Sequence, residues 1–379
     1  MMQMVHSRFN ALLSACVLSL IATAGWSQSI TWLGTLPDGT WSEAYGVSAN
    51  GVVVGGADNA AGQRRAFRWT ASGGMQDLGT LGGTQSEAYG VSADGRVVVG
   101  WAQNAAGVYR AFRWTASGGM QDLGTLPNTY SGEAYAVSAD GAVVVGVARG
   151  SGGFGYAFRW TASGGMQYLD ALYNDRSEAR GVSANGAVVV GGPWRAFRWT
   201  PATGMQDLGH LGGSYSVAYG VSANGAVVVG GANNARYERR AFRWTASGGM
   251  QDLGHLGGSY SEAYGVSADG SVVVGWAYNA AGQRRAFRWT ASVGDMENLY
   301  ATYGNLLTPG SVLEVARAIS PDGRYIVGWG INAATGRREA FLLDTGRGRP
   351  RCNGDVNGDG RVDDADLLEV LFNFGNQCP

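Results

Sequence analysis

The phrase Ala-Phe-Arg-Trp recurs along the chain and sets its period. One copy, AFRWTASGGMQDLGTLGG, begins at Ala66, and near copies begin at Ala111 and Ala241. Its phenylalanine recurs at Phe67, Phe112, Phe158, Phe197, Phe242, Phe287 and Phe341. Most intervals are 45 or 46 residues, one is 39 and one is 54. A fixed period of this length indicates an array of one repeated structural unit.

Each unit contains four segments with the residue types of β-strands. In the second unit they are EAYGVS, RVVVGWA, YRAFRWT and GMQDLGTL, which begin at Glu87, Arg96, Tyr109 and Gly119. Ala-Asp-Gly and Ala-Ser-Gly-Gly between segments are turn signals, and Val, Phe, Trp, Tyr and Thr favour strands. Residues 97–99 are all valine, so we expect a strand that is covered on both faces.

Four antiparallel strands in about 45 residues are typical of a β-propeller blade. The seventh unit stops after its third strand at Asp344, whereas SITWLGTL, from Ser29, matches an isolated fourth strand. The sequence therefore predicts an all-β fold: a seven-bladed β-propeller over residues 28–346, closed by residues 29–36. The alternative, an open β-solenoid or sandwich array, would need atypical capping units at its ends.

Residues 1–27 are predicted to be a secretory signal peptide. Arg8 precedes the apolar run ALLSACVLSLIATAG, and Ala22-Thr23-Ala24 offers a cleavage site. The alternatives are an uncleaved membrane anchor, although the run is short for one, and lipidation at Cys16. We therefore expect a secreted or cell-surface protein that meets the membrane only through this segment or a secondary anchor.

Charge and composition exclude several functions. The net charge is −1 and the chain contains no lysine. A nucleic-acid partner is not expected, because such proteins carry an excess of basic side chains. The absence of lysine also excludes Schiff-base chemistry and a phosphate-loop lysine. We expect the protein to be a monomer.

A short arginine-rich linker, residues 347–351, leads to a different segment, residues 352–379. Oxygen donors there fall at alternate positions of a loop with glycine at its sixth position, which is a calcium-binding pattern. The predicted Ca²⁺ ligands are Asp355, Asn357, Asp359, the carbonyl of Arg361, Asp363 and Asp366. A solvated acidic turn is the alternative. Cys352 and Cys378 flank the segment and are expected to form a disulfide, with two free thiols as the alternative.

The sequence resembles two known families. The phrases AFRWT, GMQDLGTLGG and EAYGVSADG resemble the HAF repeats of bacterial probable extracellular repeat proteins over residues 30–344, which implies export and a β-repeat fold. Asp366, at the twelfth position of the calcium loop, makes residues 352–379 similar to a type I dockerin repeat. Dockerins pair two such repeats to bind cohesin, and this chain shows one, which puts cohesin binding in doubt.

Candidate catalytic residues follow the repeat instead of breaking it. His210 and His255 occupy the place that Thr80 and Thr125 hold in other units. The carboxylates recur by unit in the same way, at Glu43, Glu87, Glu133, Glu178 and Glu262 and at Asp77, Asp122, Asp207 and Asp252. So do the arginines Arg68, Arg113, Arg159, Arg198, Arg243 and Arg288. We expect structural ion pairs and hydrogen bonds from these residues, and no catalytic residue.

The loop before each EAYGVS segment varies between units. Its aromatic residues are Trp41, Tyr130, Tyr215 and Tyr260, which we expect on one rim of the ring. The variable loops that begin at Ala57 and Ala232 should share this rim. Exposed aromatic rings can stack on sugars or anchor a protein. The alternative is that these rings pack on their own turns.

These observations predict a non-catalytic binding or interaction scaffold, whose partner is a glycan or a cell-envelope protein. One alternative is an extracellular carbohydrate-active enzyme, a polysaccharide hydrolase or lyase, or an accessory to one, because dockerin-like tails often occur on such proteins. The other alternative is a purely structural repeat protein of the cell surface.

Overall fold

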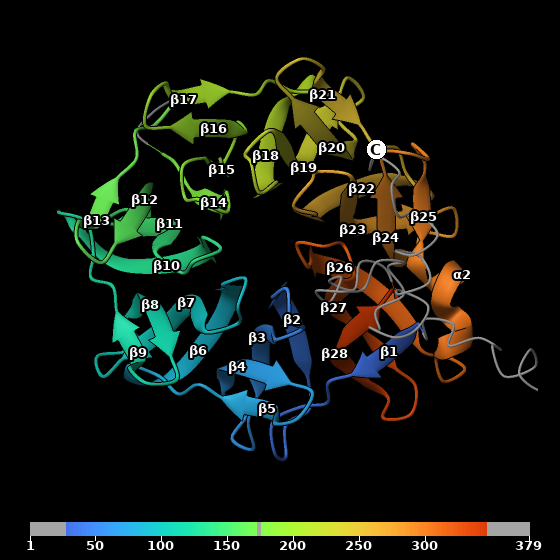
Figure 1. Ribbon diagram of the computed structural model, residues 1–379, viewed down its shortest axis with the longest axis horizontal. Coiled ribbons are helices and arrows are strands. Elements are labelled where there is room, and N and C mark those ends of the chain that lie inside the picture. The colour runs from blue at the N-terminus through green and yellow to red at the C-terminus, as the bar shows by residue number, and fades with distance from the viewer. Residues whose placement is uncertain (1–27, 173–175, 347–379) are drawn as a thin grey trace, which may run out of the picture.

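Seven four-stranded antiparallel sheets form a closed ring (Figure 1). The computed structural model describes residues 28–172 and 176–346. Each sheet is one blade, with its first strand nearest the axis and its fourth strand outermost. The predicted seven-bladed propeller is thereby confirmed.

The strands of the seven blades are as follows. Blade 1 contains β2 (Ser42–Val47), β3 (Val53–Asp58), β4 (Arg64–Thr70) and β5 (Gly74–Asp77). Blade 2 contains β6 (Gly82–Val91), β7 (Val97–Asn104), β8 (Tyr109–Thr115) and β9 (Gly119–Asp122). Blade 3 contains β10 (Thr129–Val137), β11 (Val143–Gly150), β12 (Gly155–Thr161) and β13 (Gly165–Tyr168). Blade 4 contains β14 (Ala179–Val182), β15 (Val189–Gly191), β16 (Phe197–Thr200) and β17 (Gly204–Asp207).

The other three blades complete the ring. Blade 5 contains β18 (Gly212–Val221), β19 (Val227–Asn234), β20 (Arg239–Thr245) and β21 (Gly249–Asp252). Blade 6 contains β22 (Gly257–Val266), β23 (Val272–Asn279), β24 (Arg284–Thr290) and β25 (Met296–Asn298). Blade 7 contains β26 (Val312–Ile319), β27 (Tyr325–Asn332), β28 (Arg337–Asp344) and, as its outermost strand, β1 (Ser29–Trp32).

The first strand of the described chain closes the ring, as predicted. β1 pairs antiparallel with β28, so that Ser29 faces Asp344 and Trp32 faces Phe341. The rings of Trp32 and Phe341 meet edge to face at 6.2 Å. Leu33 then donates its backbone N–H to the carbonyl of Ala340 at 2.9 Å. Residues far apart in sequence thus build one sheet.

The repeated phenylalanine fills the core between blades. Each of the seven is at most 1% exposed, and each faces a glycine on the neighbouring strand, as Phe67 faces Gly55. A Cβ at Gly55 would lie 2.8 Å from the Phe67 ring and 2.0 Å from the Glu43 carbonyl oxygen. The glycine of each Val-Val-Gly run is therefore required by packing.

Two departures from the period have structural causes. The 54-residue interval holds helix α2 (Leu299–Tyr303) and the 3₁₀ turn η1 (Gly304–Leu306), which the sequence analysis did not predict. Leu299 and Tyr303 are buried in the core of blades 6 and 7. In the 39-residue interval the strands β15 and β16 are shorter than their counterparts β7 and β8, and Trp194 lies in the loop between them.

Candidate functional site

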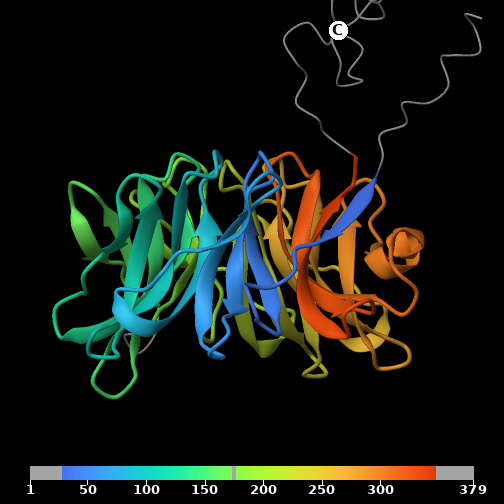
Figure 2. The same cartoon turned by 90° about the horizontal axis from the view of Figure 1, so that it is seen from below.

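The two faces of the ring differ in their connections. The loops from the second to the third strand lie on the same face as the segments that lead into the first strand, and we name it the loop face. For example, the Leu81 amide, just before β6, donates to the Gln103 carbonyl, at the end of β7, at 3.1 Å. The tight turns form the other, the turn face. Figure 2 shows the ring edge-on. Asp344 is the last residue of the third strand of blade 7, which ends at the turn face, and Ser29 pairs with it. The described chain therefore starts and ends away from the loop face.

The four predicted rim residues all lie on the loop face, in two different states. Tyr130 and Tyr260 are 55% and 44% exposed. Trp41 is half-buried, and the guanidinium carbon of Arg64 lies over its ring, 5.0 Å from the centroid. The guanidinium carbon of Arg239 lies over the ring of Tyr215 in the same way, 4.6 Å from the centroid. Trp41 and Tyr215 thus pack on their own surroundings, as the alternative held, whereas Tyr130 and Tyr260 reach solvent.

Further exposed aromatic residues on the loop face were missed by the sequence analysis. Trp194 is 60% exposed and Tyr237 is 70% exposed, and both lie in loops between second and third strands. Phe154 and Tyr109, at 39% and 43%, extend the row. The variation of these loops between units was the sequence signal that could have identified these residues. Six exposed aromatic residues therefore share the loop face, from blade 2 to blade 6.

Tyr237 has an unusual backbone conformation. Its φ is +60°, in the left-handed region, where a side chain is disfavoured. Equivalent loops place glycine there, at Gly62, Gly107 and Gly282, with φ of +68°, +75° and +71°. Blade 5 therefore has a tyrosine at a backbone conformation that these other loops fill with glycine.

The repeated glutamates of the first strands form ion pairs, mostly between blades. Arg64 of blade 1 contacts Glu87 of blade 2 at 2.9 Å, and Arg239 pairs with Glu262 of the next blade. Burial raises the pKa of the Glu87 carboxyl, although Arg64 opposes this. The remaining pairs are Arg149 with Glu133 and Glu178, Arg180 with Glu178, and Arg338 with Glu43. The repeated glutamates thus form the ion pairs that the sequence led us to expect.

The aspartates, histidines and repeated arginines also stabilise turns and blade contacts. Asp77 accepts from Arg65 Nε and from the Gly79 amide, at 3.2 and 2.8 Å. His210 Nδ1 accepts the Gly212 amide at 3.0 Å, as Thr80 Oγ1 accepts that of Gly82. Five of the repeated arginines donate Nε to a glycine carbonyl of the next blade: Arg68, Arg113, Arg159, Arg198 and Arg243. The sixth, Arg288, pairs instead with Glu297.

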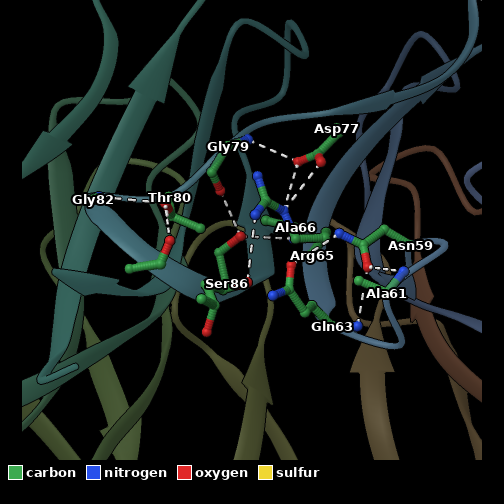
Figure 3. A network of polar contacts seen from close by, with 12 residues as sticks. Asn59, Ala61, Gln63, Arg65, Ala66, Asp77, Gly79, Thr80, Gly82 and Ser86 are labelled. Atoms are coloured by element: carbon green, nitrogen blue, oxygen red, sulfur yellow. Dashed lines mark hydrogen bonds and ion pairs between the residues drawn. The ribbon is translucent and has the colours of Figure 1, made fainter. Parts of the chain in front are cut away.

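A serine joins neighbouring blades beside this network (Figure 3). Ser86, in the first strand of blade 2, donates to the Gly79 carbonyl at 2.6 Å and accepts the Ala66 amide of blade 1 at 3.0 Å. The same acceptor contact occurs at Ser42, Ser177, Ser216 and Ser261. The sequence analysis did not single out this serine.

A cavity of about 410 Å³ lies at the centre of the ring. Its walls come from the first strands of all blades, and they include Tyr89, Tyr135, Arg180, Tyr219 and Arg317. The glycines and apolar residues that follow these side chains, such as Gly265 and Ile319, line the part nearer the turn face.

The predicted calcium ligands and the pair Cys352–Cys378 lie outside the described residues. Within the described ranges, no cluster of His, Cys, Asp and Glu is suited to hold a metal ion. Of the helices in those ranges, none is both long and apolar enough to span a membrane.

Comparison with known proteins identifies the fold alone. No family model and no curated protein matches the chain. It is similar to the β-propeller domain of the Trilobed protease from Pyrococcus furiosus, at 10% identity and a TM-score of 0.51, over 80% of this chain and 96% of that one. That domain has an open Velcro topology, whereas β1 closes the ring here.

Two TolB structures show weaker similarity. The chain matches a TolB-like protein from Agrobacterium tumefaciens at 15% identity and a TM-score of 0.44, over 69% of this chain and 89% of that one. It matches TolB from Acinetobacter baumannii at 10% identity and a TM-score of 0.45, over 78% and 64%. The β-propeller is a known architecture, as the Trilobed protease domain shows, and the three structures are only 10–15% identical to this chain.

Proposed function

We propose that this protein is an exported, non-catalytic binding scaffold, whose loop face engages a glycan or a protein of the cell envelope. The observation that carries the proposal is the segregation of exposed aromatic residues. Six of them share the loop face, whereas the turn face is built from short Ala-Asp/Asn-Gly and Ala-Ser-Gly-Gly turns. Aromatic side chains are enriched at binding surfaces because they bury a large area at low entropic cost.

The backbone of Tyr237 supports this proposal. A non-glycine residue in the left-handed region costs about 1–2 kcal/mol. Such strain persists at functional positions more often than elsewhere. Since three equivalent loops use glycine, stability alone would favour glycine at this position too.

The predicted tail fits the same role. The signal peptide would export the chain, and the segment 352–379 would fold around Ca²⁺ with the disulfide Cys352–Cys378. Because residue 346 lies at the turn face, a module attached there would leave the loop face free for a partner. We propose that this module attaches or stabilises the chain at the cell surface as a monomer.

Binding of the full-length protein to a glycan array and to isolated cell-envelope fractions tests the proposal. We expect a bound partner, and we expect Trp194→Ala and Tyr237→Gly each to weaken binding at least about tenfold, as removal of an aromatic anchor does. Tyr237→Gly should not lower the free energy of unfolding, because glycine suits the positive φ. Loss of binding in this variant therefore cannot be attributed to unfolding.

The matched control is Val293→Ala, since Val293 is 71% exposed in a turn of the opposite face. Its binding should equal that of the wild type. If no glycan or envelope protein binds, or if Tyr237→Gly binds unchanged, the loop face is not a recognition surface. A purely structural role would then be favoured.

A further inference from the structure

Seven side chains form a ring around the central cavity. Each first strand contributes the residue two positions after the site of the repeated glutamate. In chain order they are Tyr45, Tyr89, Tyr135, Arg180, Tyr219, Tyr264 and Arg317, and all seven line the cavity. Blades 4 and 7 therefore break the repeat with arginine.

The tyrosines act as walls. The hydroxyls of Tyr45, Tyr89 and Tyr264 donate to the glutamates of their own strands, at 2.7, 3.1 and 2.6 Å. Neighbouring rings meet edge to face or tilted, as Tyr45 and Tyr89 do at 5.4 Å. The hydroxyl donors of Tyr45, Tyr89 and Tyr264 are thus committed to the protein, and the faces of their rings remain as cavity surface.

The two arginines have different partners. Arg180 pairs with Glu178 of its own strand. Arg317 has Val315 in place of that glutamate, and among the residues that the structure describes it has neither an ion pair nor a hydrogen-bond acceptor. Its guanidinium lies over the rings of Tyr264 and Tyr219, at 4.1 and 5.8 Å. All five of its donors therefore remain available.

In the described residues, the first-strand glutamates form no ion pair with Arg317. Glu43, Glu87, Glu133, Glu178 and Glu262 contact Arg64, Arg149, Arg180, Arg239 and Arg338, and Glu314 of β26 also contacts Arg338. Arg180 and Arg317 are the two arginines in the cavity lining, and of these two only Arg180 has an ion pair. A cavity with low-dielectric walls strengthens the attraction of Arg317 for an anion.

We propose that the central cavity binds a small carboxylate of the size of a sugar acid, and that Arg317 pairs with its carboxyl group. A guanidinium presents a planar fork that matches a carboxylate in a bidentate way. The volume of about 410 Å³ is within the range of small-molecule sites, and the tyrosine rings offer apolar faces for a sugar ring. One unpaired cation calls for one negative charge. This site is separate from the loop face.

Isothermal titration of the full-length protein with glucuronate and glucose tests this proposal, since the two differ by the carboxylate. We expect glucuronate to bind at least about tenfold more tightly than glucose, the difference expected of a charged bidentate pair. Arg317→Gln should abolish that preference. Arg317→Lys should retain part of it, because it keeps the charge but not the fork.

Two controls complete the design. Arg96→Gln removes an 84% exposed arginine of the turn face and should leave glucuronate affinity unchanged. Tyr237→Gly should also leave glucuronate affinity unchanged, so this test is independent of the test of the loop face. Equal affinity for glucose, unchanged binding in Arg317→Gln and Arg317→Lys, or binding of inorganic phosphate and sulfate without glucuronate would each overturn the carboxylate site.

Discussion

At the scale of single residues, buried charges in this propeller are balanced across blade boundaries. Glu87 is a glutamate whose burial is only partly offset by its contacts. Its side chain is 1% exposed, and Oε2 receives Arg64, Tyr89 and Trp101, whereas Oε1 has no partner in the described part of the chain. Arg64 is 43% exposed, so the attraction is partly screened. Burial therefore prevails, and the pKa of Glu87 is raised above 4.5.

The raised pKa makes a prediction about Glu87→Gln. The native state keeps the Glu87 proton to a higher pH than the unfolded chain does, so wild-type stability should fall as pH rises from 4.5 through the raised pKa. The variant should lack this decline. At pH 7 its free energy of unfolding should differ from the wild type by no more than about 1 kcal/mol, because a buried charge and a weak ion pair are lost together. Urea unfolding between pH 4 and 8 measures both effects.

Asp94→Asn provides a control of opposite sign. The Ser92 hydroxyl and the Arg96 amide lower the pKa of Asp94, so its contribution is present above pH 3.8 and is lost as pH falls through the lowered pKa. Asparagine is tolerated here, since Asn50, Asn185 and Asn224 hold the same turn position. A pH profile of Glu87→Gln that matched the wild type would refute the assignment to Glu87.

At the scale of elements, blades are joined by hydrogen bonds that a strand pattern does not reveal. Ser86→Ala leaves the Ala66 amide without an acceptor and the Gly79 carbonyl without its donor. Ser86 and Ala66 are both buried, so water cannot replace the lost partner. We expect a loss of about 1–3 kcal/mol in the free energy of unfolding, by urea titration. Ser117→Ala, in an exposed turn, should change stability by less than about 0.5 kcal/mol.

Elements with strict periodicity could be predicted, and elements that break it could not. The four strands of each blade followed from residue type and turn signals, because a pleated surface selects both. Helix α2 did not, since its five residues are too short to show a helical period and owe their form to burial of Leu299 and Tyr303. The exposed state of Trp194 was equally hidden, because exposure depends on packing between blades.

At the scale of the whole molecule, symmetry separates structure from candidate function. The repeat accounts for the core, the ion pairs and the turns, so each of these features was accessible from the sequence. The candidate sites lie where the repeat is broken, at Tyr237 and Trp194 on the loop face and at Arg317 in the cavity. The sequence shows an arginine at position 317, where most units have tyrosine, but only the ring geometry brings Arg317 next to Tyr219 and Tyr264.

Closure of the ring is the property on which both candidate sites depend, and it can be tested by cross-linking β1 to β28. Thr31 and Leu342 are direct partners in the ladder, so Thr31→Cys with Leu342→Cys should form a disulfide in the oxidised protein. Because the bond would enclose almost the whole propeller, it should raise the free energy of unfolding by up to about 5 kcal/mol. The increase should disappear on reduction, as thermal unfolding with and without dithiothreitol would show.

The register supplies a control for this experiment. Ile30 neighbours Thr31 but points to the other face of the sheet, so Ile30→Cys with Leu342→Cys should not cross-link. Cross-linking of both pairs would mean that β1 slides along β28, and cross-linking of neither would mean that the ring is open in solution. In an open ring, blades 1 and 7 would no longer hold Tyr45 and Arg317 around one cavity, and the carboxylate site would lose its geometric basis.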